Sequence, residues 1–279
     1  EISECLVGSE MCIRDSYQQD IDAKKLWDKI IHNAWKSAEP GVMFWDTIIR
    51  ESIPDCYADE GFTTVATNPC GEIPLCPYDS CRLLALNLFS YVDNPFKPTA
   101  KFNFDKFREH VGYAMHMMDD IIDLELEKVE QIIAKIEDDP EDEDVRRVEL
   151  ELWKKIRTMA QKGRRTGLGI TAEGDMLAAL GLRYGTPEAT AFAVKVQKTL
   201  ALEAYRASVK MAAERGAFEI FDARKEEKNP MIGRIREADP ELYAEMVKHG
   251  RRNIAMLTIA PTAVSYTHLR AHETLANLV

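Results

Sequence analysis

Short apolar segments alternate with longer helical patterns along this chain, and this alternation constrains its fold more than any other feature. The apolar segments are too short for buried helices and end at residues that break regular structure, so we expect strands there. Strands that alternate with helices predict an α/β domain whose strands are buried under the helices. No internal repeat or linker divides residues 17–262. The expected strands are 42–45, 62–66, 81–89, 164–170 and 254–259, and the main expected helices are 17–38, 104–136, 145–161, 176–180, 186–215, 230–237 and 240–248.

The composition narrows the functional classes. The apolar fraction of 46% and the charged fraction of 30% are typical of a globular protein. The net charge of −11 disfavours a protein that coats nucleic acid, because binding backbone phosphates requires a basic face. No apolar run approaches the ~18 residues of a membrane span, and no signal peptide opens the chain. These two absences lead us to expect no membrane partner. Six cysteines in 279 residues are too few for a disulfide scaffold, so we expect a reducing cytoplasm.

A short loop carries the strongest chemical signal. The residues from Asn68 to Glu72 place an amide, a thiol and a carboxylate together, separated by Pro69 and Gly71, which break both helix and strand. A second thiol, Cys81, follows eleven residues after Cys70. This arrangement suits chemistry in which one sulfur attacks, a carboxylate moves a proton and another sulfur supplies electrons.

The cysteines at 70, 76 and 81 leave two other interpretations open. Their gaps of five and four residues do not match the Cys-x2-Cys pairs of zinc sites, and no histidine lies nearby, so we expect no metal ligands here. A buried, inert thiol suits Cys76, which stands between Leu75 and Pro77. The same interpretation explains Cys70 poorly, because that residue follows a proline on a broken loop.

Two further patterns match known motifs weakly. Asp119, Asp120 and Asp123 form the Asp-Asp-x-x-Asp pattern of prenyl-transferring magnesium enzymes, but the second acidic motif of those enzymes is missing, and a solvated acidic face is the simpler interpretation. Gly167 and Gly169 fit a loose dinucleotide fingerprint outside a clear βαβ unit. A turn or a tight packing position explains these glycines more simply.

The two ends of the chain resemble translated sequencing-adapter strings. We therefore treat residues 1–16 and 263–279 as non-native segments and exclude them from the fold, as one would a fusion scar. The native segment is then 17–262, and we expect it to be a fragment of a longer protein.

Several separated motifs, in a fixed order, resemble the catalytic large chain of ribonucleotide reductase. They begin with Asn68–Leu75 and continue with Tyr78–Cys81 and Leu86–Leu88. The short gap between Cys70 and Cys81 is most similar to the adenosylcobalamin-dependent class II form. Further matching stretches lie at 164–170, 175–185 and 258–262. The resemblance implies part of a helix-rich, ten-stranded α/β barrel with a catalytic finger loop inside it.

The same resemblance implies a role for each residue of the loop. Cys70 would carry the thiyl radical and abstract hydrogen from the ribose 3′ carbon, Glu72 would take the 3′-hydroxyl proton, and Asn68 would hydrogen-bond the sugar hydroxyls. Cys81 would be one of the two thiols that reduce the product radical. The substrate phosphate would bind at a partial loop, of which Ala260, Pro261 and Thr262 are present. A reactive sulfur radical needs shielding, so we expect this site inside a barrel.

The resemblance also implies cofactors and partners. These are adenosylcobalamin, with no binding residues identified in this sequence, a ribonucleoside di- or triphosphate substrate, a thioredoxin- or glutaredoxin-type reductant, and a homodimeric full-length enzyme. The family's upstream reducing cysteine and its C-terminal cysteine pair have no counterpart here, so we expect this chain to be inactive alone. A class I large subunit with a separate radical-generating subunit remains an alternative, and a Cys-based metal or redox-binding module remains an alternative of another class.

Overall fold

The computed structural model describes residues 20–262, and the chain divides into two units, residues 1–45 and 46–279. In the first unit, α2 (Ala23–Ser37) begins after Asp22, whose carboxylate accepts two backbone N–H groups of the first turn. The helix expected at 17–38 is thus confirmed over α2, whose apolar side is exposed. The end segments 1–16 and 263–279 lie outside the described residues.

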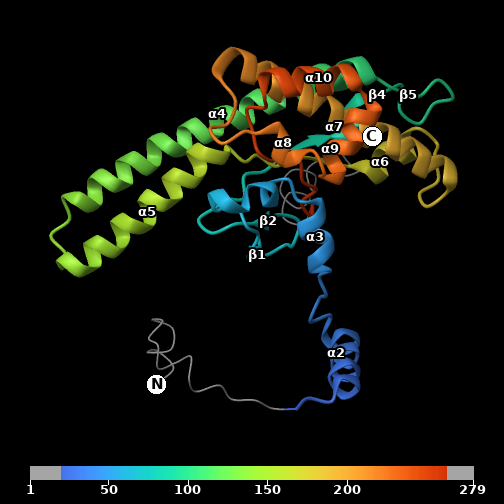
Figure 1. Ribbon diagram of the computed structural model, residues 1–279. Coiled ribbons are helices and arrows are strands. Elements are labelled where there is room, and N and C mark those ends of the chain that lie inside the picture. Colours follow the sequence, from blue (N-terminus) through green and yellow to red (C-terminus); the bar gives the residue numbers. More distant parts are fainter. Residues whose placement is uncertain (1–19, 263–279) are drawn as a thin grey trace. The chain divides into compact units, whose positions relative to one another are not determined.

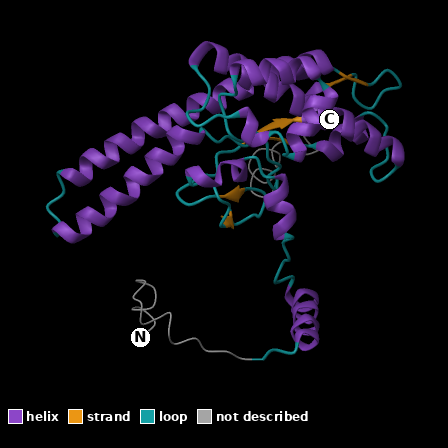
Figure 2. Cartoon of the chain, in the orientation of Figure 1, coloured by secondary structure: helices purple, strands orange, loops and turns teal. Residues whose placement is uncertain are grey.

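The second unit holds the remaining elements, which Figures 1 and 2 show as a few short strands among many helices. Its three longest helices, α4 (Phe104–Glu137), α5 (Glu143–Gly163) and α7 (Pro187–Arg215), account for most of the regular structure. The elements run in the order α3 (Trp45–Glu51), η1 (Pro54–Glu60), β1 (Ala66–Thr67), β2 (Pro74–Leu75), β3 (Leu84–Asn87), η2 (Leu88–Tyr91), β4 (Val92–Asp93), β5 (Lys101–Phe102), α4 (Phe104–Glu137), α5 (Glu143–Gly163), β6 (Leu168–Thr171), α6 (Glu173–Ala179), α7 (Pro187–Arg215), α8 (Ala223–Glu226), α9 (Pro230–Ala238) and α10 (Pro240–His249).

Three parallel segments form the centre of this unit. Strands β3 and β6 pair in parallel with Leu84 opposite Leu168, and Leu168 also forms a parallel bridge with Leu257. The Leu168 amide donates to the Met256 carbonyl at 2.7 Å, and the Thr258 amide donates to the Leu168 carbonyl at 3.0 Å. Because parallel neighbours require long crossovers, β6 receives partners from segments far away in the sequence on both sides.

Two glycines allow these segments to approach closely. A Cβ added at Gly169 would lie 2.1 Å from the Thr258 carbonyl oxygen, and one at Gly167 would lie 2.4 Å from the Arg82 carbonyl oxygen. Neither backbone oxygen can move aside cheaply, so only glycine fits. The tight-packing interpretation of the two glycines is confirmed.

The helices lie close to their expected ranges. The pattern at 104–136 becomes α4, and 145–161 becomes α5. These two helices run side by side as a hairpin (Figure 1), and the acidic residues between them are mostly exposed, as expected for a solvated loop. Helix α7 begins after Thr186, whose hydroxyl accepts the Ala189 amide. These boundaries follow from local caps and apolar spacing, which the sequence shows directly.

The strand predictions are less accurate than the helix predictions. Residues 42–45 form no strand, and Trp45 instead begins α3. Only Ala66 of the segment 62–66 belongs to a strand. The strand expected at 81–89 is shorter, at β3, and its side chains are half-buried or exposed rather than buried. A strand needs a hydrogen-bonded neighbour, and no pattern within the segment itself reports whether one is present.

The carboxylates of the Asp-Asp-x-x-Asp pattern bind arginines. Asp119 is fully buried and accepts hydrogen bonds from Arg164 at 2.9 Å and Arg252 at 3.1 Å. Asp123 accepts from Arg164 at 2.8 Å, and Asp120 lies 3.2 Å from Arg215. The simple interpretation as a solvated acidic face is therefore wrong for Asp119, which joins α4 to the segment before β6 and to the chain beyond α10.

Candidate functional site

The loop with the strongest sequence signal is the tip of a small antiparallel hairpin. Strands β1 and β2 pair with Ala66 opposite Leu75, and residues 68–73 connect them. Gly71 has a φ of 81°, a conformation that favours glycine, and its amide donates to the Asn68 carbonyl at 2.9 Å. The Asn68 side-chain oxygen accepts the Ile73 amide at 2.9 Å. The expectation of a tight loop is confirmed. The side chain of Asn68, which is 6% exposed, stabilises the loop through its hydrogen bond with Ile73.

Asn68 also connects this loop to the second thiol. Its side-chain nitrogen donates to the Cys81 sulfur at 3.6 Å. Cys81 is exposed at the surface, but partial desolvation of its sulfur raises the pKa of the thiol. The negative charge of Glu72 and the neighbouring Cys70 raise this pKa further, whereas the hydrogen bond from Asn68 opposes them. The four residues expected at the site are therefore close enough to influence one another.

Glu72 carries a free acceptor. Its Oε2 atom is buried and has no hydrogen-bond partner among the described residues. Buried carboxylate oxygens normally find partners, so an unsatisfied one is ready to accept a hydrogen bond from a ligand. The Glu72 backbone carbonyl is held by the Thr258 hydroxyl at 3.2 Å. The structure thus places a carboxylate with acceptor capacity beside two thiols.

The loop is less enclosed than expected. Both Cys70 and Cys81 are exposed, although we expected a site shielded inside a barrel. The parallel segments among residues 20–262 are those at β3, β6 and Leu257, and they form no closed barrel. The exposure of both thiols therefore differs from the expected shielding.

The partial phosphate loop follows the third parallel segment. Ala260 and Thr262 are half-buried, and Pro261 is exposed. The Thr262 hydroxyl lies 3.4 Å from that of Thr171, the last residue of β6. The three residues therefore lie at the carboxyl end of a parallel strand, where ligands of α/β proteins commonly bind.

The remaining cysteines have different surroundings. Cys76 is buried, and its thiol donates to the Asp79 carboxylate at 3.2 Å. Burial, together with the charge of Asp79, raises the pKa of Cys76 to about 12. Arg165 binds the same carboxylate at 2.6 Å. The interpretation of Cys76 as an inert thiol is therefore supported. Sequence patterns did not reveal two contacts near the loop, which are the ion pair of Arg165 with Asp79 and the hydrogen bond of Thr258 to the Glu72 carbonyl.

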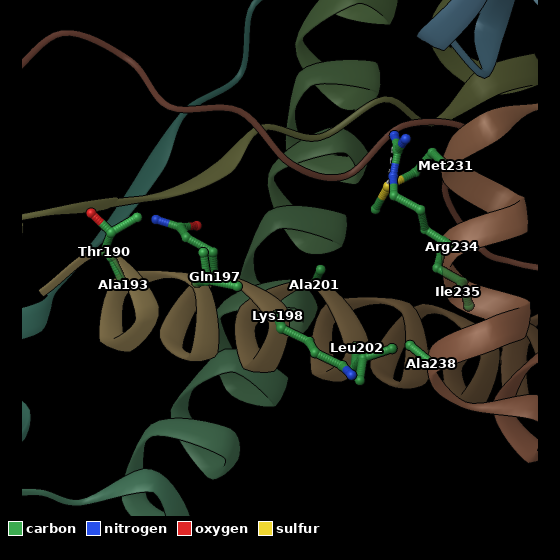
Figure 3. A pocket seen from close by; sticks show the side chains of 11 residues that line it. Thr190, Ala193, Gln197, Lys198, Ala201, Leu202, Met231, Arg234, Ile235 and Ala238 are labelled. Carbon is green, nitrogen blue, oxygen red and sulfur yellow. Dashed lines mark hydrogen bonds between the residues drawn. The ribbon is translucent and has the colours of Figure 1, made fainter. Parts of the chain in front are cut away.

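Away from the loop, the described residues 46–262 form an apolar cavity but no metal-ligand cluster. A cavity of about 550 Å³ lies between α7 and α9 (Figure 3) and is lined mainly by apolar side chains, with none of the expected site residues among them. In residues 20–262, no three His, Cys, Asp or Glu side chains are grouped so that they could hold a metal ion. Over the same residues, no helix is both long and apolar enough to cross a membrane.

Comparison with known proteins identifies relatives along nearly the whole chain. Residues 9–275 match the family described as ribonucleotide reductase, barrel domain. A vitamin B12-dependent ribonucleoside-diphosphate reductase of Thermoplasma acidophilum is 37% identical over 198 residues, covering 71% of this chain and 22% of the relative. One of the same name from Mycobacterium tuberculosis is 30% identical over 242 residues, covering 86% of this chain and 27% of the relative.

A solved structure supports the fold. The class Id ribonucleotide reductase alpha subunit of Actinobacillus ureae superposes with a TM-score of 0.57 at 22% identity, over 87% of this chain and 37% of that one. The chain thus spans about a quarter of the length of the curated relatives it matches. The family match overlaps both end segments set aside above, so the boundaries 17 and 262 stay a prediction.

Proposed function

The chain belongs to the ribonucleotide reductase barrel-domain family, and we propose that the protein it comes from reduces ribonucleotides to 2′-deoxyribonucleotides for DNA synthesis. The observation that carries this proposal is the convergence of Asn68, Cys70, Glu72 and Cys81 around one hairpin tip. A thiol, a carboxylate acceptor and a second thiol are the groups that radical reduction of a sugar requires.

Each of the four residues has a distinct part in the proposed mechanism. Cys70 carries the thiyl radical and takes the hydrogen atom from the ribose 3′ carbon. Glu72 accepts the 3′-hydroxyl proton through its free Oε2 atom, and loss of the 2′-hydroxyl as water follows. Asn68 hydrogen-bonds the sugar hydroxyls, and Cys81 supplies one of the two thiols that become a disulfide. The sugar of the substrate binds beside these four residues, and Ala260, Pro261 and Thr262 contribute to binding its phosphate.

The proposed cofactor is adenosylcobalamin, as the names of the two relatives suggest. When bound, it would supply the radical through cleavage of its cobalt–carbon bond. Cys70 is the residue that would receive the radical, and we assign no cofactor contact to any other residue.

Two other functions have weaker support. A class I large subunit with a separate radical-generating subunit keeps some support from a Chlamydia pneumoniae relative named ribonucleoside-diphosphate reductase subunit alpha, which is 24% identical. A Cys-based metal or redox-binding module would not require an acceptor such as Glu72 beside the thiols. The two more similar relatives favour the cobalamin-dependent form.

The same assignment leads to proposals for the substrate, reductant, oligomeric state and location of the full-length enzyme. We propose a ribonucleoside di- or triphosphate as substrate, a thioredoxin- or glutaredoxin-type reductant, a homodimer and a cytoplasmic location.

The proposal is tested in the complete reductase that contains this segment. Cys70→Ser should abolish formation of deoxyribonucleotides in the presence of adenosylcobalamin and a dithiol, while leaving the circular dichroism spectrum unchanged. Cys56→Ser is the matched control, because Cys56 is also a free thiol and lies outside the loop. Turnover that persists in Cys70→Ser would overturn the radical role, and turnover by the unmodified enzyme without cobalamin would favour the class I alternative.

A further inference from the structure

Thr258 makes a contact that links the catalytic loop to the parallel sheet. Its hydroxyl donates to the backbone carbonyl of Glu72 at 3.2 Å, across 186 positions of sequence. This is the contact by which the described structure joins the Glu72 backbone to the segment that leads into the partial phosphate loop. Fixing the carbonyl of a residue holds its peptide plane and therefore the Cα atom from which its side chain projects.

The position of Thr258 itself is fixed by its other groups. Its amide donates to the Leu168 carbonyl at 3.0 Å, and its carbonyl packs so closely on β6 that a Cβ at Gly169 would lie 2.1 Å away. A Cβ at Gly167 would also lie 3.0 Å from the Thr258 methyl group. Thr258 is therefore held against the central strand on two sides, and its hydroxyl is a rigid anchor for the loop.

The anchored residue has an unsatisfied carboxylate oxygen. The Glu72 Oε2 atom is buried without a partner among the described residues, so no hydrogen bond of its own holds that oxygen in place. Its position then depends on the backbone beneath it. Thr258 lies two residues before Ala260, so one short segment connects the hydrogen-bond partner of Glu72 to the start of the phosphate loop.

We propose that Thr258 is a positioning residue, which sets the place of the Glu72 carboxylate relative to the strand that leads to Ala260, Pro261 and Thr262. This inference rests on the proposed function of Glu72 as the base that takes the 3′-hydroxyl proton. The sugar and phosphate ends of a nucleotide are separated by a fixed number of bonds. A hydroxyl that ties the two parts of the site together therefore matches their spacing to one substrate.

The experiment compares Thr258→Val, which keeps the shape and removes the hydroxyl, with Thr258→Ser, which keeps the hydroxyl. In the complete reductase, Thr258→Val should lower kcat by roughly ten- to a hundredfold with KM changed less than about twofold, since misplacement of a catalytic group affects the reacting state most. Thr258→Ser should retain most of the rate. Thr199→Val is the matched control, because the Thr199 hydroxyl only bonds the Lys195 carbonyl within α7.

A second readout is independent of activity. Hydrogen exchange at the amides of Gly71 and Ile73 should accelerate in Thr258→Val and stay near the unmodified rate in Thr258→Ser, because the loop loses its anchor only in the first variant. Equal exchange in both variants, or an unchanged kcat in Thr258→Val, would overturn the positioning role. Failure of the proposed function would look different: Cys70→Ser would keep its turnover, whatever Thr258 does to the loop.

Discussion

The side-chain amide of Asn68 donates to the Cys81 sulfur at 3.6 Å, while its oxygen accepts the backbone amide of Ile73 at 2.9 Å. One residue thus holds the loop in shape and connects it to a thiol thirteen positions away. The charge balance around this thiol leads to a first prediction.

Replacement of Glu72 should make Cys81 more reactive. The negative charge of Glu72 raises the pKa of Cys81, so Glu72→Gln should lower that pKa and increase the thiolate fraction near pH 8. The rate of alkylation by iodoacetamide, followed at Cys81 by peptide mass spectrometry over a range of pH, measures the change.

Asn68→Ala is the matched variant with the opposite sign. It removes a hydrogen bond that lowers the pKa of Cys81, so alkylation at the same pH should slow. A shift in the same direction for both variants would contradict this account of the site's electrostatics.

The buried thiol should behave differently from the exposed ones. Burial and the nearby Asp79 raise the pKa of Cys76 to about 12, so almost no thiolate exists at pH 8. We expect iodoacetamide to modify Cys70 and Cys81 in the folded chain and to leave Cys76 intact until urea is added. Modification of Cys76 at a rate similar to that of Cys81 in the folded chain would show that the 76–81 segment opens readily.

Loss of the Asp119 charge should destabilise the fold strongly. Asp119→Asn removes the fully buried carboxylate that Arg164 and Arg252 share, and removing one partner of a buried ion pair costs roughly 3–5 kcal/mol. Asp123→Asn is the control, because Asp123 is half-exposed and such pairs contribute about 0–1 kcal/mol. Urea unfolding monitored by circular dichroism gives both values.

The same carboxylate predicts a pH dependence. Burial alone would raise the pKa of Asp119, but the hydrogen bond and charge of Arg164 and the charge of Arg252 outweigh it and lower that pKa. A depressed pKa in the folded state adds stability that is present above the unfolded value, about 3.9, and is lost as the pH falls through the folded value. The free energy of unfolding should therefore decline below about pH 4 less steeply in Asp119→Asn than in the unmodified chain.

A methyl group at Gly169 should disrupt the parallel sheet. Gly169→Ala places a Cβ against the Thr258 carbonyl, and overpacking of this kind costs about 1–3 kcal/mol or more because backbone must move. Gly112→Ala in α4 has open space around the added Cβ and should instead stabilise the chain by about 0.5–1 kcal/mol. Thermal unfolding of the two variants should shift in opposite directions, and a stable Gly169→Ala protein would contradict the close approach.

Features that depend on neighbouring residues could be predicted from the sequence. The spacing of apolar residues indicates α4, the cap at Thr186 indicates the start of α7, and Pro69 and Gly71 indicate the tight loop. Helices satisfy their hydrogen bonds within a few residues, so their signals are local. The resemblance at Asn68–Leu75 also indicated the family, which the match over residues 9–275 shows.

Features that require distant partners could not be predicted in this way. The segment 42–45 has strand-like composition but no strand partner, and residues 254–259 pair with β6 through little more than one bridge. The acidic pattern at 119–123 looked like a solvated face, yet Asp119 lies buried between two arginines from other parts of the chain. Pairing across such distances depends on which segments meet after the chain has folded.

The sequence by itself determined the main helices and the broken loop at Asn68–Glu72, because each is encoded in residues close together along the chain. It also determined the family, because several short motifs follow one another in a fixed order. Only the tertiary structure decided that Asn68 holds Cys81, that Thr258 holds Glu72 and that Gly169 lies against a carbonyl. Each of these contacts depends on the spatial meeting of separate segments, and their hydrogen bonds and close approaches exist only when the parallel strands are packed together.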